Sequence, residues 1–297
     1  MSNDSGELVN APGQLFLRCA GIVVCLVWCW TAQSAEEVVR VSRDLVVLYD
    51  FGDSSGIIVR DRAGVADPID LTIEDPEKVR RSPGALEVSG STLISSLHPP
   101  RRLIQAIKKS GALTIEAWVE PSRENQSGPA RMVTLSKDST NRNFTLGQDG
   151  NQVDVRLRSL QTSNNGLPSL AAKSGSLTLQ LAHLVYTRDR DGQSRIWVNG
   201  KLSASGKISG RLSNWQRAMR LALGNEINKS RPWLGTYHLV AIYQRALSAK
   251  EIEQNYAAGA GVLAPPVVVR KTRDPRETHF ELEVAPILAN QCLECHD

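Results

Sequence analysis

The chain has 297 residues, of which 41% are hydrophobic and 22% charged, and it carries a formal net charge of +4. These proportions exclude a disordered chain and indicate a globular protein large enough to bury its own hydrophobic core. The positive charge is spread along the sequence without a basic block, so we expect it to aid solubility and do not expect nucleic-acid binding.

An apolar segment near the N-terminus has the pattern of an export signal. Residues 19–30 form an uncharged apolar run preceded by a single arginine. The run is short for a membrane span, which needs about 20 apolar residues, and suits the hydrophobic part of a signal peptide. The small residues that follow favour cleavage after Ser34 or Ala35, which predicts a signal peptide over residues 1–35. The alternative is an uncleaved N-terminal anchor, the one case in which we expect contact with a membrane.

Export would leave only two cysteines in the mature chain. Cys19, Cys25 and Cys29 lie in the apolar run and would be removed with it. Cys292 and Cys295 would remain, three positions apart, which is not the cysteine usage of a disulfide-stabilised domain. We therefore expect both remaining thiols to serve a single site in a protein of the bacterial periplasm or cell surface.

Residues 45–240 carry the pattern of short β-strands. Residues 112–119 alternate between apolar and other side chains, which predicts a strand with one buried face. Residues 45–51 and 153–158 are further β-prone runs. Tight hairpin turns are indicated by Asp149-Gly150, Asp191-Gly192 and Asn199-Gly200. Many short strands joined by such turns predict an antiparallel sandwich or barrel.

Two short helices are expected. Residues 102–109 have apolar side chains at helical spacing. A second helix begins after Ser248, which forms a capping box with Glu251, and ends at Gly259. Residues 259–279 then read as a linker that is rich first in small residues and proline and later in charge.

Several of these segments resemble the strands of laminin-G-like, concanavalin A-like domains. The matching stretches are residues 112–121, 181–189, 195–201 and 233–248. The resemblance covers residues 45–258 and implies an all-β, antiparallel jelly-roll sandwich with a short C-terminal helix. This fold carries lectins, adhesion modules and glycosidases, so it implies a polysaccharide or a cell-surface component as the partner without identifying it.

Glycosidases of this fold carry closely spaced carboxylates on one strand, as nucleophile and acid. The nearest pair here is Glu116 and Glu120, which share a face of the predicted strand. Glu120 precedes a proline at the strand end, and no third acid lies between the two. We therefore expect both to be solvated on the outer face, with no catalytic residue and a protein that is not an enzyme; glycosidase activity is the less favoured alternative.

Tryptophans are the candidate sugar contacts, because their rings combine a large apolar face with a polar N–H group. We expect Trp118 and Trp197 to pack inside strands and Trp215 to be exposed in a loop, which makes Trp215 the candidate ligand contact; Trp233 is a further candidate. His183 falls at a position where the family has a packing histidine. Members of this fold sometimes bind calcium, but the sequence shows no compact acidic cluster that supports a calcium site.

Residues 280–297 contain the C-x-x-C-H pattern of covalent haem c attachment. Cys292 and Cys295 lie one helical turn apart and would bond the two vinyl groups of the porphyrin, and His296 would be the proximal ligand of the iron. A zinc site would need further ligands, and a redox disulfide would need a thioredoxin-like context. A motif that no longer serves any function is the remaining alternative.

The same segment resembles the start of a planctomycete-type cytochrome c domain, through Phe280, the Val-x-Pro-Ile-Leu motif at residues 284–288 and the C-x-x-C-H motif. The resemblance implies electron transfer, with an unidentified redox partner, and a helical tail that carries the haem motif. No distal Met or His ligand follows His296. We therefore expect a truncated cytochrome c segment, as a gene split or a fragmentary gene model would produce.

The sequence as a whole predicts an exported binding module for a carbohydrate or a cell-surface partner, joined to an incomplete haem c site. The alternative is a purely adhesive or carbohydrate-binding module with a non-functional tail.

Overall fold

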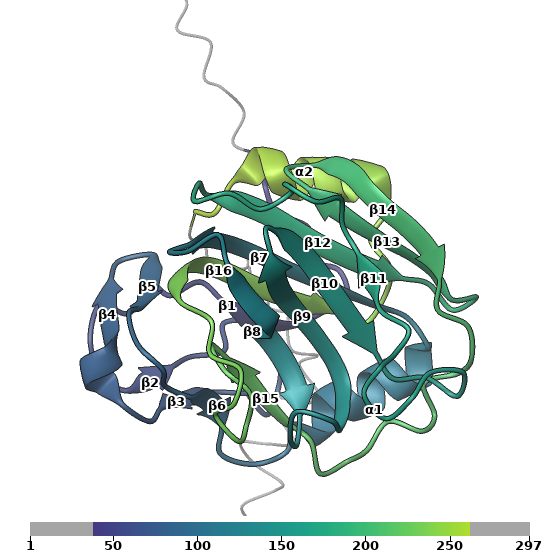
Figure 1. Cartoon of the computed structure of the whole chain (residues 1–297), viewed down its shortest axis with the longest axis horizontal. Coiled ribbons are helices and arrows are strands. Elements are labelled where there is room, and N and C mark those ends of the chain that lie inside the picture. Colours follow the sequence, from purple (N-terminus) through teal and green to yellow (C-terminus); the bar gives the residue numbers. More distant parts are fainter. Residues whose placement is uncertain (1–37, 262–297) are drawn as a thin grey trace, which may run out of the picture. The chain divides into compact units, whose positions relative to one another are not determined.

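The computed structural model describes residues 38–261, which form two antiparallel sheets of eight strands each (Figure 1). Sheet A contains β1 (Leu45–Tyr49), β4 (Val79–Ser82), β5 (Ala85–Val88), β7 (Leu113–Pro121), β12 (Ala182–Arg188), β13 (Gln193–Val198), β14 (Lys201–Lys207) and β16 (Gly235–Tyr243). Sheet B contains β2 (Ile58–Val59), β3 (Leu71–Ile73), β6 (Ile94–Ser96), β8 (Gln126–Ser136), β9 (Arg142–Gly150), β10 (Gln152–Leu157), β11 (Leu170–Ala171) and β15 (Arg220–Leu223).

Strands far apart in the sequence lie side by side in both sheets. Sheet A runs β14-β13-β12-β7-β16-β5-β4, and β1 pairs with β16. Sheet B runs β11-β10-β9-β8-β15-β6-β3-β2. The expected all-β antiparallel sandwich with a short C-terminal helix is confirmed.

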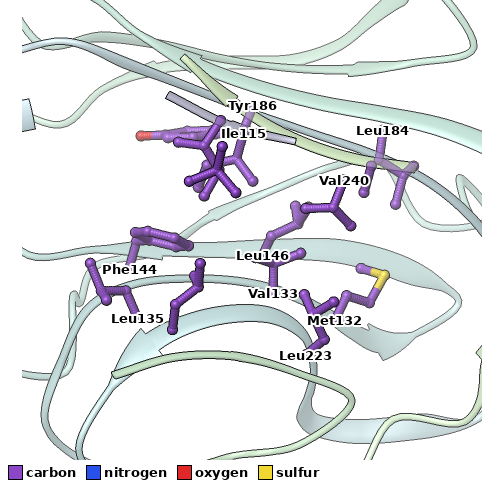
Figure 2. Close-up of a cluster of buried hydrophobic side chains, with 14 of the residues drawn as sticks. Ile115, Met132, Val133, Leu135, Phe144, Leu146, Leu184, Tyr186, Leu223 and Val240 are labelled. Atoms are coloured by element: carbon purple, nitrogen blue, oxygen red, sulfur yellow. The ribbon is translucent and has the colours of Figure 1, made fainter. Parts of the chain in front are cut away.

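The main hydrophobic core fills the space between the two sheets (Figure 2). Ile115, Tyr186 and Val240 contribute to it from sheet A, and Val133 and Phe144 from sheet B; all five are fully buried. Along β7, core-facing residues alternate with residues that face away from the core, which is the period of two that the sequence shows over residues 112–119. The inner face of β7 is therefore as expected.

The outer face of β7 differs from the expectation. Helix α2 (Ala249–Ala258) covers this side of sheet A and forms a second hydrophobic cluster that includes Trp118, Tyr243 and Ile252. Both faces of β7 are consequently buried as far as Val119, and only Glu120 is exposed within the strand. The prediction of a half-buried strand is wrong because a period of two does not show that a distant helix covers the second face.

Both predicted helices are present. Helix α1 (Arg101–Ser110) buries Leu103, Ile104 and Ile107, and Gly111 ends it with a φ of 66° in the left-handed region. The capping box that begins α2 is confirmed, because Ser248 and Glu251 each bond the other's backbone N–H group. A 3-10 turn, η1 (Pro76–Lys78), precedes β4. Within residues 38–261, no helix is long and apolar enough to cross a membrane.

The predicted hairpin at Asn199-Gly200 joins β13 to β14. Asn199 has a φ of 51° and Gly200 a φ of 73°, as a two-residue turn between twisted strands requires.

Candidate functional site

The outer face of sheet B carries buried polar side chains on the neighbouring strands β8 and β9. On β8, Thr134 lies between Val133 and Leu135, which point into the core, so Thr134 points to the other side of the sheet. On β9, Thr145 occupies the same kind of position. The two hydroxyl oxygens are 2.8 Å apart across the strands, and both side chains are fully buried.

Beside these threonines lie Arg131 of β8, Arg142 of β9 and Glu226, which follows β15; we call these three residues the arginine cluster. All three are fully buried. The Nε of Arg131 donates to Glu226 Oε2 at 2.9 Å, and Arg142 Nη1 lies 3.9 Å from the same oxygen. Ser136 donates to the other carboxylate oxygen. One carboxylate therefore balances two guanidinium groups.

The arginine cluster contains donors without acceptors. Arg131 Nη2 and Arg142 Nε are buried and find no hydrogen-bond partner in the part of the chain that the structure describes. Burial lowers the pKa of Arg131, and the charge of Glu226 opposes this effect. Burial, followed by the charge of Arg131, lowers the pKa of Arg142 to about 9. Both groups are cationic, because a guanidinium stays protonated in proteins, and part of their hydrogen-bonding capacity is unused.

Arg156 on the neighbouring strand β10 is close enough for its positive charge to contribute to the lowered pKa of Arg131 and of Arg142. Arg156 pairs with Thr145 in the strand register, and its side chain is 18% exposed. It bonds Asp154 Oδ1 at 3.2 Å and Asn165 Oδ1 at 3.4 Å. This side of sheet B thus carries an excess of positive charge, most of it buried.

The sequence interpretation did not single out the arginine cluster. The sequence feature that could have revealed it is the position of Arg131 and Arg142 within β-strands, where the residues two positions along each strand are buried. An arginine in such a register is expected to be buried only if the sheet face is covered or the charge is paired. Glu226 lies 95 residues from Arg131, so no local pattern connects them.

A second polar cluster surrounds Glu116 on the outer face of sheet A. Glu116 Oε1 accepts from Arg40 and lies 2.9 Å from His183 Nε2. Glu116 Oε2 accepts from Asn255 at 2.8 Å and from the Tyr243 hydroxyl at 3.4 Å. Arg40 also donates to the carbonyl oxygens of Asn255 and Gly259. The Glu116 cluster therefore ties residue 40 to β7 and to the end of α2.

The expectation that Glu116 and Glu120 are both solvated is wrong for Glu116. Glu116 is fully buried, whereas the side chain of Glu120 is 50% exposed and lies 4.0 Å from His238 Nε2. Burial alone would raise the pKa of Glu116, but the charge of Arg40 and the hydrogen bonds from His183 and Arg40 lower it to about 2. Glu116 is thus an ionised, fully hydrogen-bonded member of the interior.

The expectation that Trp215 is exposed is also wrong. Its side chain is 2% exposed, and its indole N–H donates to the Arg158 carbonyl oxygen at 2.7 Å. It packs beside Phe144 in the main core, where the loop that follows β14 folds back. The basis for naming Trp215 as a ligand contact is therefore lost.

Within residues 38–261, the other tryptophans and His183 pack in the interior or against it. Trp118 stacks on His183 with ring centres 4.7 Å apart, and Trp197 packs against the same outer cluster of sheet A. Trp233 is fully buried and donates to Gln148 Oε1 at 2.9 Å. His183 is fully buried, as expected of a packing and hydrogen-bonding histidine.

A surface pocket of about 490 Å³ lies beside the start of α1, lined in part by Asp67, Asp70, His98 and Arg101. His98 is exposed there. None of the lining residues has a buried polar atom without a partner. The arginine cluster is therefore the stronger candidate site.

The predicted haem residues Cys292, Cys295 and His296 lie outside the described residues, as do the predicted signal peptide and almost all of the linker. Among residues 38–261, no group of three or more His, Cys, Asp or Glu side chains is placed to hold a metal ion.

Two stacked antiparallel sheets with a charged cluster on one outer face define a β-sandwich of the lectin-like class. The chain belongs to the concanavalin A-like lectin/glucanases superfamily, whose profile matches residues 99–253. The laminin-G-like resemblance is confirmed at this level; no comparison shows a cytochrome c domain. No curated protein matches the sequence.

Solved structures share the fold at low sequence identity. A Trypanosoma rangeli sialidase in complex with sialic acid has a TM-score of 0.55 and 17% identity over 74% of this chain. The binding domain of botulinum neurotoxin DC, in complex with rat synaptotagmin II, has a TM-score of 0.52 and 13% identity over 72% of this chain. The match covers 34% of the sialidase chain and 51% of the toxin chain.

The sialidase matches correct the expectation that the protein is not an enzyme. Sialidases are glycosidases, and six of the similar structures are sialidases or a sialidase mutant. The expectation was drawn from one pair of carboxylates in one strand. Since the same fold occurs in glycosidases, the fact that Glu116 and Glu120 do not form a catalytic pair does not exclude glycosidase activity.

Proposed function

We propose that this protein is an exported binding protein whose sandwich binds a carbohydrate or a cell-surface partner. The observation that carries the proposal is the arginine cluster, with its buried, unpartnered donors on the outer face of sheet B. Buried polar groups in folded proteins are almost always hydrogen-bonded, so donors left open point to a ligand. Two similar structures, a sialidase with sialic acid and a toxin binding domain with synaptotagmin II, support the same class of role.

A glycan array probed with the full chain tests the binding function. We expect saturable binding to at least one class of polysaccharide. A matched pair of variants locates it: Arg142→Gln alters the arginine cluster, whereas Arg80→Gln alters an arginine whose side chain is 82% exposed on β4. The proposal would be contradicted if Arg80→Gln weakened binding as much as Arg142→Gln does. It would also be contradicted if the chain bound no glycan and no cell-wall polymer. Each bound glycan is also assayed for hydrolysis.

We further propose that Cys292 and Cys295 attach haem c and that His296 is the proximal iron ligand. The support is the C-x-x-C-H sequence pattern, because thiols one helical turn apart can form two thioethers with one porphyrin. Haem bound there would supply one-electron transfer. The alternative remains a purely adhesive or carbohydrate-binding module whose tail has no function.

Co-expression of the full chain with haem-attachment machinery tests this second proposal. The expected result is haem that stays on the polypeptide in a denaturing gel and disappears in the Cys292→Ala/Cys295→Ala variant. The His296→Ala variant should keep covalent haem but change its visible absorption, because only the axial ligand is lost. If the wild-type chain carries no covalent haem, the site does not function in this chain.

Export from the cytoplasm is part of the same proposal, on the support of the apolar run at residues 19–30. The mass of the protein recovered from the periplasm should show removal of residues 1–34 or 1–35. A periplasmic or membrane-bound protein of full mass would instead show an uncleaved anchor.

A further inference from the structure

The arginine cluster has an unbalanced charge. Arg131 and Arg142 are both fully buried, and Glu226 is the one carboxylate that contacts them within residues 38–261. A buried charge is costly unless it is paired and hydrogen-bonded. Because Arg142 Nη1 remains 3.9 Å from Glu226, the second guanidinium lacks a close anionic partner.

Other charges near the cluster do not remove this imbalance. Arg156 is already engaged by Asp154, and Arg231 adds a further positive charge that acts on Arg131. Asp138 acts on Arg142 from a distance, but it is bonded to Thr140 and Asn141. The surroundings as a whole therefore favour an additional negative charge.

The donors that lack a hydrogen-bond partner indicate where an additional negative charge would bind. Arg131 Nη2 and Arg142 Nε are the unpartnered atoms, on neighbouring strands β8 and β9 (Figure 1). Each guanidinium contributes one open nitrogen, because the other two nitrogens of Arg131 and of Arg142 are already hydrogen-bonded. A carboxylate that accepts one hydrogen bond from each group would satisfy both and neutralise the excess charge.

We propose that the arginine cluster binds the carboxylate of an acidic sugar, such as a uronic acid unit of a polysaccharide. The inference rests on the proposed carbohydrate-binding function and names its ligand class. Trp118, Trp215 and Trp233 are buried, so recognition at this site depends on charged hydrogen bonds and not on stacking against these rings. Arg156, which pairs with Thr145 in the strand register, is the partly exposed positive charge next to the cluster.

Calorimetric titration of the full chain with oligogalacturonate tests the proposal, and the fully methyl-esterified oligomer is the matched control. The ester keeps the sugar skeleton and removes the negative charge. We expect saturable binding of the acid and at least about tenfold weaker binding of the ester, as the loss of charge-assisted hydrogen bonds implies. Equal affinity for the two oligomers would overturn the proposal.

Variants assign the effect to the cluster. Arg142→Gln should weaken binding of the acid about tenfold or more, whereas Arg80→Gln should leave it unchanged. Arg142→Lys keeps the charge but removes the open Nε donor, and it should have an intermediate affinity. Glu226→Gln removes the carboxylate that competes with the ligand for the two arginines. Galacturonate should therefore raise the melting temperature of this variant more than that of the wild type. Galactose, the uncharged control, should raise neither melting temperature. A wild-type affinity in folded Arg142→Gln would contradict the assignment.

The outcomes also separate this inference from the proposed function. Binding of neutral glycans but not of acidic ones would disprove the acidic ligand and leave the binding function intact. Binding of sulfated but not of carboxylated oligomers would disprove the carboxylate. If no glycan of any kind binds, both proposals fail.

Discussion

At the scale of single residues, the burial of charge is the main finding. Glu116 has four polar partners in the interior, and Arg131 and Arg142 share one carboxylate. Glu116 is fully engaged by partners from distant parts of the chain, so we assign it a role in stability. The arginine cluster has donors left over, so we assign it a role in binding.

The Glu116→Gln substitution should destabilise the protein by about 3 kcal/mol or more at pH 7, because it leaves Arg40 buried without its anionic partner. Glu120→Gln, on the exposed end of the same strand, should change the free energy of unfolding by less than about 0.5 kcal/mol. Urea denaturation of the two variants measures both values. Similar losses in both would contradict the burial of Glu116.

The stabilisation from Glu116 should depend on pH. Its pKa is about 2 in the folded protein against 4.5 as the ordinary value, so folding favours the ionised form. The contribution is therefore complete above about pH 4.5 and is lost as the pH falls toward 2. The difference in unfolding free energy between wild type and Glu116→Gln should shrink over that range. A difference that stays constant from pH 7 to pH 3 would show that the carboxylate is not responsible.

Trp215→Phe separates packing from ligand contact. The substitution keeps most of the buried volume but loses the hydrogen bond to the Arg158 carbonyl oxygen, which should cost about 1–3 kcal/mol of stability. Glycan affinity should not change. Unchanged stability together with lost binding would restore Trp215 as a ligand contact.

At the scale of elements, α2 closes the outer face of sheet A. Ile252 and Leu247 pack onto the strands, and Asn255 reaches Glu116. Arg245 holds Glu251 through two hydrogen bonds of 2.8 Å, and these bonds, ahead of the capping contacts with Ser248, lower the pKa of Glu251 to about 2. The start of the helix is thereby fixed to the end of β16.

Ser248→Ala should cost about 1 kcal/mol, because the N-cap hydroxyl that bonds the Glu251 N–H is removed. Ser248→Asp keeps a capping oxygen and should stay within about 0.5 kcal/mol of the wild type. Thermal and chemical denaturation would check both values. Equal stability of all three proteins would mean that the cap is not needed.

At the scale of the whole molecule, regular alternation made the sandwich predictable. The Asn199-Gly200 hairpin, the capping box at Ser248 and the inner face of β7 follow from local chemistry, and the structure contains all three. Strands such as β2 and β11 are two residues long and carry no period, so the sequence pattern did not reveal them.

The polar clusters were not predictable for a different reason. Glu116 reads as a solvated residue because its partners lie 76, 67 and 139 residues away, at Arg40, His183 and Asn255. Arg131 and Glu226 are similarly remote. Trp215 was misplaced because a loop that packs into the core has the same composition as an exposed one. The haem site at Cys292, Cys295 and His296 stays a prediction.

The central claim is that an acidic sugar binds at the arginine cluster, and the Nε–H resonances of arginine side chains test it most directly. The Arg142 signal is assigned by its absence in Arg142→Lys. On addition of oligogalacturonate to the full chain, we predict that the Arg142 Nε–H signal moves with saturation, that the methyl ester leaves it in place, and that the Arg80 signal does not move. A bound oligomer that shifts other signals and leaves that of Arg142 unchanged would contradict the account.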